Sequence, residues 1–175
     1  MKADKLIDYI AWTLLIVSIA LLNFTSRYLE NMVFGKKFVW NYFLVGLTIS
    51  SLWLFVLYKI KPQYFVGDEK RASAVLSQFF SIIVLTIFLN AFYTYESGKK
   101  SIYLAKAIVT DKATNVKTGT DYVHLLLDGR QERFNPKKDE FKSMAKGDTL
   151  VLTIGRGETN YDIIYEFKVS SSAQH

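Results

Sequence analysis

Three long runs without a charged residue limit most strongly what this chain can fold into. They cover residues 9–26, 38–58 and 72–95, which are 18, 21 and 24 residues long. A helix needs about 20 apolar residues to cross a bilayer core about 30 Å thick. Buried helices of soluble proteins seldom reach such lengths. The runs therefore predict a membrane domain at residues 1–97 with three transmembrane helices, at about 8–26, 38–59 and 72–95.

Aromatic residues gather near the ends of these runs. Tyr and Trp favour the membrane interface because each ring combines an apolar body with a group that hydrogen-bonds. We therefore predict six interface aromatics: Tyr9, Trp12, Trp40, Tyr58, Tyr93 and Tyr95.

The first run could also be read as a secretory signal, since Lys2 and Lys5 precede it. The stretch that follows the run has no small-x-small cleavage site of the A-x-A kind. We therefore interpret the first run as a retained membrane anchor.

No Asp, Glu, His, Lys or Arg lies inside the runs, where pumps and ion-coupled transporters usually need one. Small and neutral polar residues there can instead join helices by close approach or hydrogen bonds. Gly46 and Ser50, four residues apart, would share one helix face. The predicted helix–helix packing residues are Asn41, Gly46, Ser50, Gln78 and Asn90. A transport pathway is the lesser alternative.

Flanking charges suggest an orientation. The N-terminal tail and second loop hold six basic residues, whereas the first loop holds three: Arg27, Lys36 and Lys37. Short cytoplasmic loops are enriched in Lys and Arg. We expect a multi-pass protein of the cell (inner) membrane, with its N-terminus in the cytoplasm and its C-terminal domain outside or periplasmic. The net charge of +6 comes without a nucleic-acid-binding motif, so nucleic acid is not the expected partner.

Residues 98–169 change to the pattern of a small β domain. Strand-like stretches occupy residues 101–110, 122–127, 130–134, 148–154 and 161–169, and residues 112–120 read as a polar loop. Asp128 and Gly129 form a two-residue hairpin signal. Asn135 as N-cap, Pro136 at the first position and Gly147 as C-cap predict a short helix. Residues 170–175 are expected to be a disordered tail.

The order β-β-β-α-β-β resembles the five-stranded OB-fold barrel, with an SH3-like or other small barrel as the alternative. Membrane spans followed by such a domain resemble the NfeD-like family, and the segment KGDTLVLTI, residues 146–154, is similar to later strands of that family's barrel. The glycine-rich strand–turn motifs of that family are missing here. The resemblance implies a scaffold role in a membrane assembly, with no catalytic residues to transfer.

The sequence offers no clear chemistry. Cysteine is absent, which excludes disulfides and thiol chemistry by this chain. His124 stands without a second ligand, so it predicts no metal site. Asp139 and Glu140 suit the first turn of a helix, and GRGETN, residues 155–160, reads as a hairpin turn rather than a phosphate loop. We predict no catalytic, cofactor-binding or metal-binding residue and no cofactor.

These observations favour an integral membrane protein that is not an enzyme and presents a small β domain at the membrane surface for interaction. Its expected partners are the lipid bilayer and another membrane or envelope protein, or further copies of itself. A membrane-embedded immunity or stress-protection protein is the first alternative. A membrane enzyme or transporter is the second.

Overall fold

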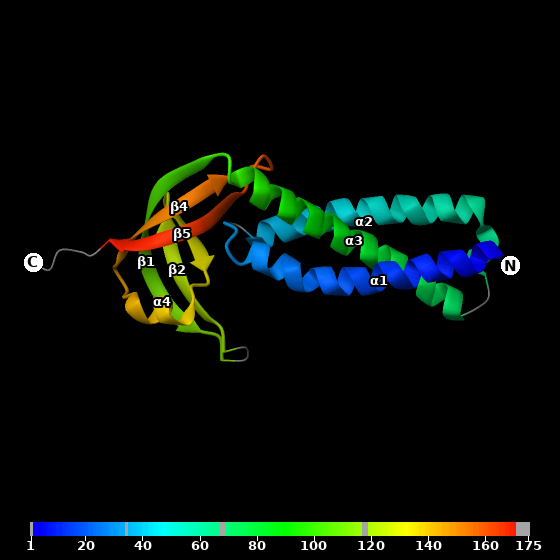
Figure 1. The fold of residues 1–175 in the computed structure, drawn as a ribbon, viewed down its shortest axis with the longest axis horizontal. Helices are drawn as coiled ribbons and strands as arrows, with labels where there is room; N and C mark the ends of the chain where they lie inside the picture. The colour runs from blue at the N-terminus through cyan, green and yellow to red at the C-terminus, as the bar shows by residue number, and fades with distance from the viewer. Residues whose placement is uncertain (1, 34, 67–68, 117–118, 171–175) are drawn as a thin grey trace, which may run out of the picture. The chain divides into compact units, whose positions relative to one another are not determined.

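The computed structural model describes residues 2–33, 35–66, 69–116 and 119–170 (Figure 1). The chain divides into two compact units, one of Met1–Arg27 and Lys36–Phe92, the other of Tyr28–Gly35 and Tyr93–His175. The first is called here the helical unit and the second the β unit, and each is described by itself. The predicted tail lies outside the described residues, apart from Ser170 at the end of the last strand.

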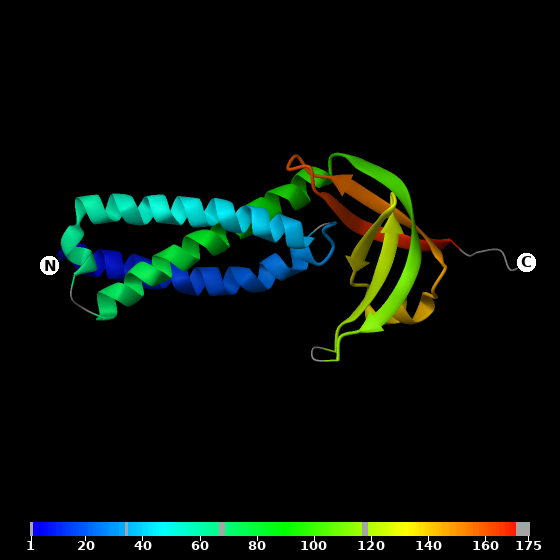
Figure 2. The same cartoon turned by 180° about the vertical axis from the view of Figure 1, so that it is seen from behind.

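Three long helices run alongside one another in the helical unit (Figures 1 and 2): α1 (Lys2–Leu29), α2 (Gly35–Ile60) and α3 (Glu69–Gly98). A short 3₁₀ helix, η1 (Pro62–Phe65), follows α2. Pro62 explains the end of α2, because proline has no N–H to continue a helix and restricts the residue before it. Segments of all three helices are long and apolar enough to cross a membrane: Asp8–Ser26, Gly35–Ile60 and Arg71–Gly98. Each helix also continues beyond its uncharged run.

A five-stranded antiparallel sheet forms most of the β unit. Its strands are β1 (Ile102–Thr114), β2 (Asp121–Leu127), β3 (Arg130–Phe134), β4 (Thr149–Arg156) and β5 (Asp162–Ser170), in the spatial order β3-β2-β1-β4-β5. The short helix α4 (Lys138–Ser143) lies between β3 and β4 in sequence. The predicted strand count and the position of the helix are confirmed.

The sheet is open, so the predicted closed barrel is not observed among the described strands. β3 and β5 form its two edges. β3 has only five residues and is soon followed by Pro136, which cannot donate to a strand ladder. Side chains still meet across the opening, where the rings of Phe134 and Phe167 lie 5.2 Å apart.

β1 is longer than predicted, because Lys112–Thr114, expected in a polar loop, continues the strand. The register with β2 shifts where Val109 pairs with Leu125 and Asp111 with His124, which leaves Thr110 as a bulge. Such a bulge lets a strand bend and continue. Lys112 then donates through Nζ to the main-chain oxygens of Phe141 and Met144 at the end of α4.

The β2–β3 hairpin is confirmed, with Asp128 at φ 49° and Gly129 at φ 75°. The caps predicted for α4 are wrong. The helix begins after Lys137, whose N–H donates to Glu140 Oε2 at 2.7 Å. It ends at Ser143, well before Gly147. Gly147 instead donates its N–H to Val109 O at 2.8 Å, with φ +94°, as the chain enters β4.

One face of the sheet carries the core of the β unit. Alternate residues of β1, β2 and β4 are buried there, among them Val109, Leu125 and Leu152. Val33, from the connection between α1 and α2, is buried in the same core. The first interhelical loop is therefore a structural part of the β unit, which the sequence domain boundary at residue 97/98 does not include.

Candidate interaction surface

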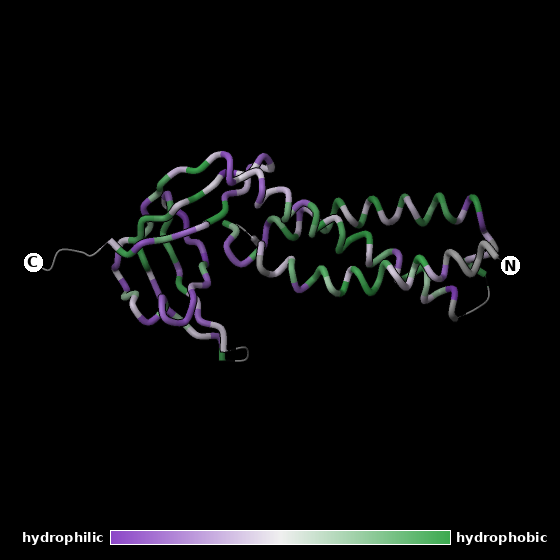
Figure 3. Tube along the Cα trace, viewed as in Figure 1, coloured by the Kyte–Doolittle hydropathy of each residue, from purple (hydrophilic) through white to green (hydrophobic). Residues whose placement is uncertain are grey.

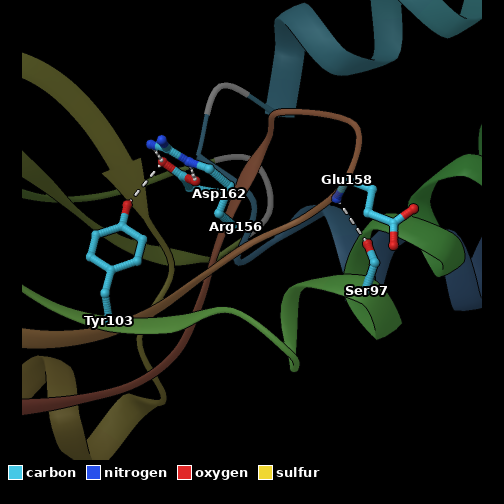
Figure 4. A network of polar contacts seen from close by, with 5 residues as sticks. All are labelled: Ser97, Tyr103, Arg156, Glu158 and Asp162. Atoms are coloured by element: carbon cyan, nitrogen blue, oxygen red, sulfur yellow. Dashed lines mark hydrogen bonds and ion pairs between the residues drawn. The ribbon is translucent and has the colours of Figure 1, made fainter.

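The last turns of α3 are bound to the β4–β5 hairpin within the β unit. Thr94 Oγ1 and Thr159 Oγ1 lie 2.6 Å apart, and the Glu158 N–H donates to Ser97 Oγ at 3.1 Å (Figure 4). Tyr93 donates its hydroxyl to the Glu158 carboxylate, and Tyr165 donates to Tyr95 O. These contacts fix the hairpin on the helix end.

Two glycines of the GRG stretch make this contact possible. A Cβ at Gly155 would lie 2.3 Å from Gly98 O, and one at Gly157 would lie 2.6 Å from Thr94 Cγ2. Real side chains do not tolerate such distances, so glycine lets the two backbones approach. The hairpin reading of residues 155–160 is confirmed by the N–H of Gly157 donating to Tyr161 O at 3.0 Å. The packing role of the glycines has no signature in the sequence alone.

Arg156, Asp162 and Tyr103 form a second polar cluster, shown in Figure 4. Arg156 donates to Asp162 Oδ1 from Nε at 2.9 Å and to Oδ2 from Nη2 at 3.2 Å, and Tyr103 donates to Oδ2 at 3.0 Å. Burial, and then the hydrogen bond to Asp162, raise the pKa of Tyr103 above its ordinary value. The Asp162 carboxylate at the start of β5 accepts from Arg156 at the end of β4 and from Tyr103 near the start of β1. The cluster therefore joins three strands rather than forming an acid–base pair.

Burial also raises the pKa of Tyr165, to about 12. Its ring packs edge-on against Tyr95 at 5.2 Å. The neutral phenol donates its hydrogen bond to Tyr95 O.

The first interhelical loop adds to the edge of β5. Met32 and Ile163 form an antiparallel bridge. Val33 donates its N–H to Asp162 O at 2.9 Å, and Ile164 donates to Asn31 O at 2.8 Å. Met32 and Val33 are both buried. The ends of α1 and α3 thus belong to the same compact unit.

The outer face of the sheet carries exposed aliphatic side chains. On β1, Ile102 is 55% exposed, Leu104 71% and Ile108 46%. On β2, Leu126 pairs with Ile108 of β1. This set of four residues is called the outer apolar row below. Large exposed apolar groups that gather on one face commonly mark an interaction site.

Lysines lie beside the outer apolar row. Lys106 pairs in register with Val151, and Val151 with Lys168, so two exposed lysines flank a half-buried valine across three strands. Glu166 follows on β5, opposite Thr153. Lys106 itself lies between Leu104 and Ile108 on β1, so the outer face combines apolar side chains with charges of both signs.

Other candidate features of the β unit show no reactive arrangement. An open pocket of about 370 Å³ lies among Glu30, Asp121, Asn135, Lys137 and Lys138, with both signs of charge on its wall. His124 stacks edge-on against Tyr122 at 5.4 Å, on the outer face of β2. Asp139 and Glu140 occupy the first turn of α4. No group of three metal-ligating side chains occurs within residues 8–170 as far as they are described.

The residues predicted to pack helices lie in different surroundings in the helical unit. Gly46 and Ser50 are buried, and a Cβ at Gly46 would lie 2.9 Å from Ile83 Cα. Gln78 is buried and accepts a hydrogen bond from Trp53 Nε1 at 2.9 Å. Asn90 is half-buried and donates to Thr86 O at 2.8 Å. Asn41 is exposed.

The predicted interface aromatics are mostly exposed. Tyr95 is half-buried in the β unit, whereas the side chains of the others project outward: Tyr9, Trp12, Trp40, Tyr58 and Tyr93. Their place at a membrane interface stays a prediction. Sequence reasoning missed two residues with polar roles, Ser18 and Tyr64. Ser18 donates to Ser81 O at 3.5 Å and Tyr64 to Asp8 Oδ1 at 2.7 Å.

No family model matches the chain, and no curated protein matches it.

Proposed function

We propose that this chain is a membrane-anchored interaction protein, which is not an enzyme and which uses the outer face of its sheet to bind another protein. The observation that carries the proposal is the outer apolar row. Leu104 and Ile102 lie on a central strand with more than half of their side-chain surface exposed. A sheet that only needed solubility would place polar residues at these positions.

The attachment of the β unit supports this role. The β4–β5 hairpin is bound to the last turns of α3, and the first interhelical loop is bound to β5. Both points of attachment lie within the β unit and fix the sheet on the last turns of α3 and on the first interhelical loop. A sheet held in this way suits a fixed assembly contact better than a long-reach tether.

The chemistry of the surface favours a protein partner over nucleic acid. Binding of single strands relies on aromatic rings on which bases stack. The outer apolar row is aliphatic, and Lys106 and Lys168 beside it can meet acidic side chains. We infer that the partner is another membrane or envelope protein, or a second copy of this chain.

The architecture adds an analogy. Membrane spans followed by a β domain resemble NfeD-like proteins, and the sheet with α4 between β3 and β4 resembles an OB-like domain that is open between β3 and β5. An SH3-like barrel remains the competing description. This resemblance implies a scaffold and agrees with the proposal, although a fold alone does not determine function.

The interaction is tested by changing the row without changing the core. Leu104→Glu should remove the partner from a cross-linked complex recovered from membranes, because a charge replaces the apolar contact. Val116→Glu, at a position that is 97% exposed outside the row, should leave the complex intact. Retention of the complex by Leu104→Glu, with the fold unchanged, would refute the proposed surface.

An enzymatic role would give a different result. Alanine at His124, Asp139 or Glu140 should leave the biological activity of the protein intact if the scaffold proposal is correct. Loss of activity from one of these changes, with folding and complex formation unchanged, would instead favour a membrane enzyme.

We further propose that the β unit faces outside or the periplasm, because the N-terminal tail and second loop hold more basic residues than the first loop. Ser143→Cys gives a single exposed thiol in a chain without cysteine. Labelling of intact cells by an impermeant maleimide, after any outer membrane is opened, should succeed. Labelling only after lysis would place the β unit in the cytoplasm.

A further inference from the structure

Residues 31–33 of the first interhelical loop lie along the edge of strand β5. They pair with β5 through the bridge between Met32 and Ile163, which consists of two main-chain hydrogen bonds of 2.9 and 2.8 Å. Edge strands leave N–H and C=O groups ready for pairing, and proteins commonly cover them. Here the cover is a segment whose two ends continue into α1 and α2.

The two apolar residues of this segment, Met32 and Val33, lie on opposite faces of the sheet. Val33 belongs to the core cluster of the inner face. Met32 is bridged to Ile163. Gly155 pairs with Ile163 on one side and with the outer-face residue Ile102 on the other, so Ile163 belongs to the outer face, yet it is fully buried. Release of the segment would therefore uncover an apolar residue and part of a strand edge together.

We propose that residues 31–33 are a latch: they cover the β5 edge at Asp162–Ile164 while bound, and their release exposes a site that accepts an extended apolar peptide strand. A short segment anchored by two side chains can open locally while the rest of a domain stays folded. The edge it leaves is the kind that binds an extended partner by strand addition. The proposal does not depend on the outer apolar row being the principal interaction surface.

Local opening can be measured on the full-length protein with single cysteines, because the native chain has none. Ile163→Cys places an edge thiol at the covered strand, Leu152→Cys a core thiol at a fully buried position and Val116→Cys a surface thiol at an exposed one. With no other change to the chain, maleimide should label the edge thiol and the core thiol slowly and the surface thiol rapidly. Rapid labelling of the edge thiol in this background would show that the edge is open and would overturn the proposal.

Val33→Asp should then release the latch, because a carboxylate cannot remain unpaired in the core. The expected result is labelling of the edge thiol that is faster by about tenfold or more while the core thiol stays protected. Val116→Asp makes the same change at an exposed position and should alter neither rate. Equal acceleration at both thiols would show that the segment is only part of the core, and no acceleration would show that it covers nothing. Either outcome would overturn the latch.

A cross-link provides a second test that does not weaken the fold. Flanking hydrogen bonds make Met32 and Ile163 a non-hydrogen-bonded antiparallel pair, for which Cα atoms lie about 4.5 Å apart, within the range of disulfides. Met32→Cys with Ile163→Cys should form a disulfide under mild oxidation. Met32→Cys with Val169→Cys, farther along β5, should not. Failure of the first pair, or equal linking by both, would contradict the bridge.

The strand-accepting property is tested with a peptide of residues 28–36 added to the protein that carries both Val33→Asp and Ile163→Cys. The peptide should restore protection of the edge thiol at up to about millimolar concentration, the effective concentration of a tethered segment. A peptide with Met and Val replaced by Ser should not protect. Absence of protection by the native peptide would overturn strand acceptance.

Discussion

The helical unit and the β unit of this chain differ in where their large apolar side chains lie. In the helical unit, small or polar residues such as Gly46 and Ser50 are buried beside a few large ones such as Phe38, while many large apolar residues, including Leu52, face outward. In the sheet, Leu125 and Leu152 are fully buried. Figure 3 shows the helices as largely hydrophobic and the β unit as alternating. The difference is the one expected of helices that cross a membrane, because lipid removes the reason to hide large apolar groups and close packing then favours small ones.

The change with the largest expected effect on this contrast replaces one leucine in each unit. Leu152→Ala should lower the free energy of unfolding by about 2–5 kcal/mol, since it removes a fully buried side chain and leaves a cavity. Leu52→Ala, where the leucine is 61% exposed, should change it by only about 0.5 kcal/mol. Thermal unfolding of the lipid-reconstituted protein measures both. Similar losses would contradict the inverted packing of the two units.

A second test adds bulk to adjacent positions of α2. Ser50 is buried and Ser51 is exposed. Ser50→Leu should destabilise the helical unit by about 1–3 kcal/mol through overpacking, while Ser51→Leu should be nearly neutral in lipid. The measurement is resistance of the helical unit to denaturing detergent. If Ser51→Leu proves the more harmful, the packed face of α2 has been assigned wrongly.

Alkaline pH should weaken the β unit selectively. The pKa of Tyr165 is about 12 in the folded state, against about 10 in an unfolded chain. Above pH 10 the unfolded state loses this proton first, so stability falls as pH rises from about 10 to about 12. Tyr165→Phe should flatten this decline and cost about 1 kcal/mol at neutral pH through the lost hydrogen bond. Near-ultraviolet circular dichroism across this range would show whether the two proteins differ.

The smallest expected effect concerns a polar contact between helices. Trp53→Phe removes the hydrogen bond to Gln78 and should cost about 0.6 kcal/mol, a typical value inside membranes. Trp40→Phe, at an exposed ring, is the control. An equal loss from both changes would indicate that ring size, rather than the hydrogen bond, matters.

The sequence predicted the elements of this fold better than their connections. The length of the uncharged runs predicted the three apolar helices, and the Asp128–Gly129 pair predicted one hairpin. Both signals are local in sequence. The burial of Val33 in the sheet's core and the approach of Gly155 to Gly98 join residues distant in sequence. No periodicity encodes such contacts. Closure of the barrel was predicted from strand order alone, which does not determine whether the edge strands β3 and β5 pair with each other.

The candidate surface was predictable only in part. The alternation in β1 places Ile102, Leu104 and Ile108 on one face, but the other face is apolar too, and the sequence did not distinguish the covered face from the exposed one. That distinction requires knowing where Val33, Met144 and Phe134 pack.

The pairing of residues 31–33 with β5 also imposes an order on biosynthesis. The loop leaves the ribosome early, whereas its partner strand β5 is made much later. Contacts so distant in sequence form late, because loop-closure entropy opposes them until the intervening chain is organised. A translating chain therefore holds Met32 and Val33 without their binding site until β5 is complete. A nascent protein truncated before Asp162 would carry all three apolar helices and an unfinished β unit.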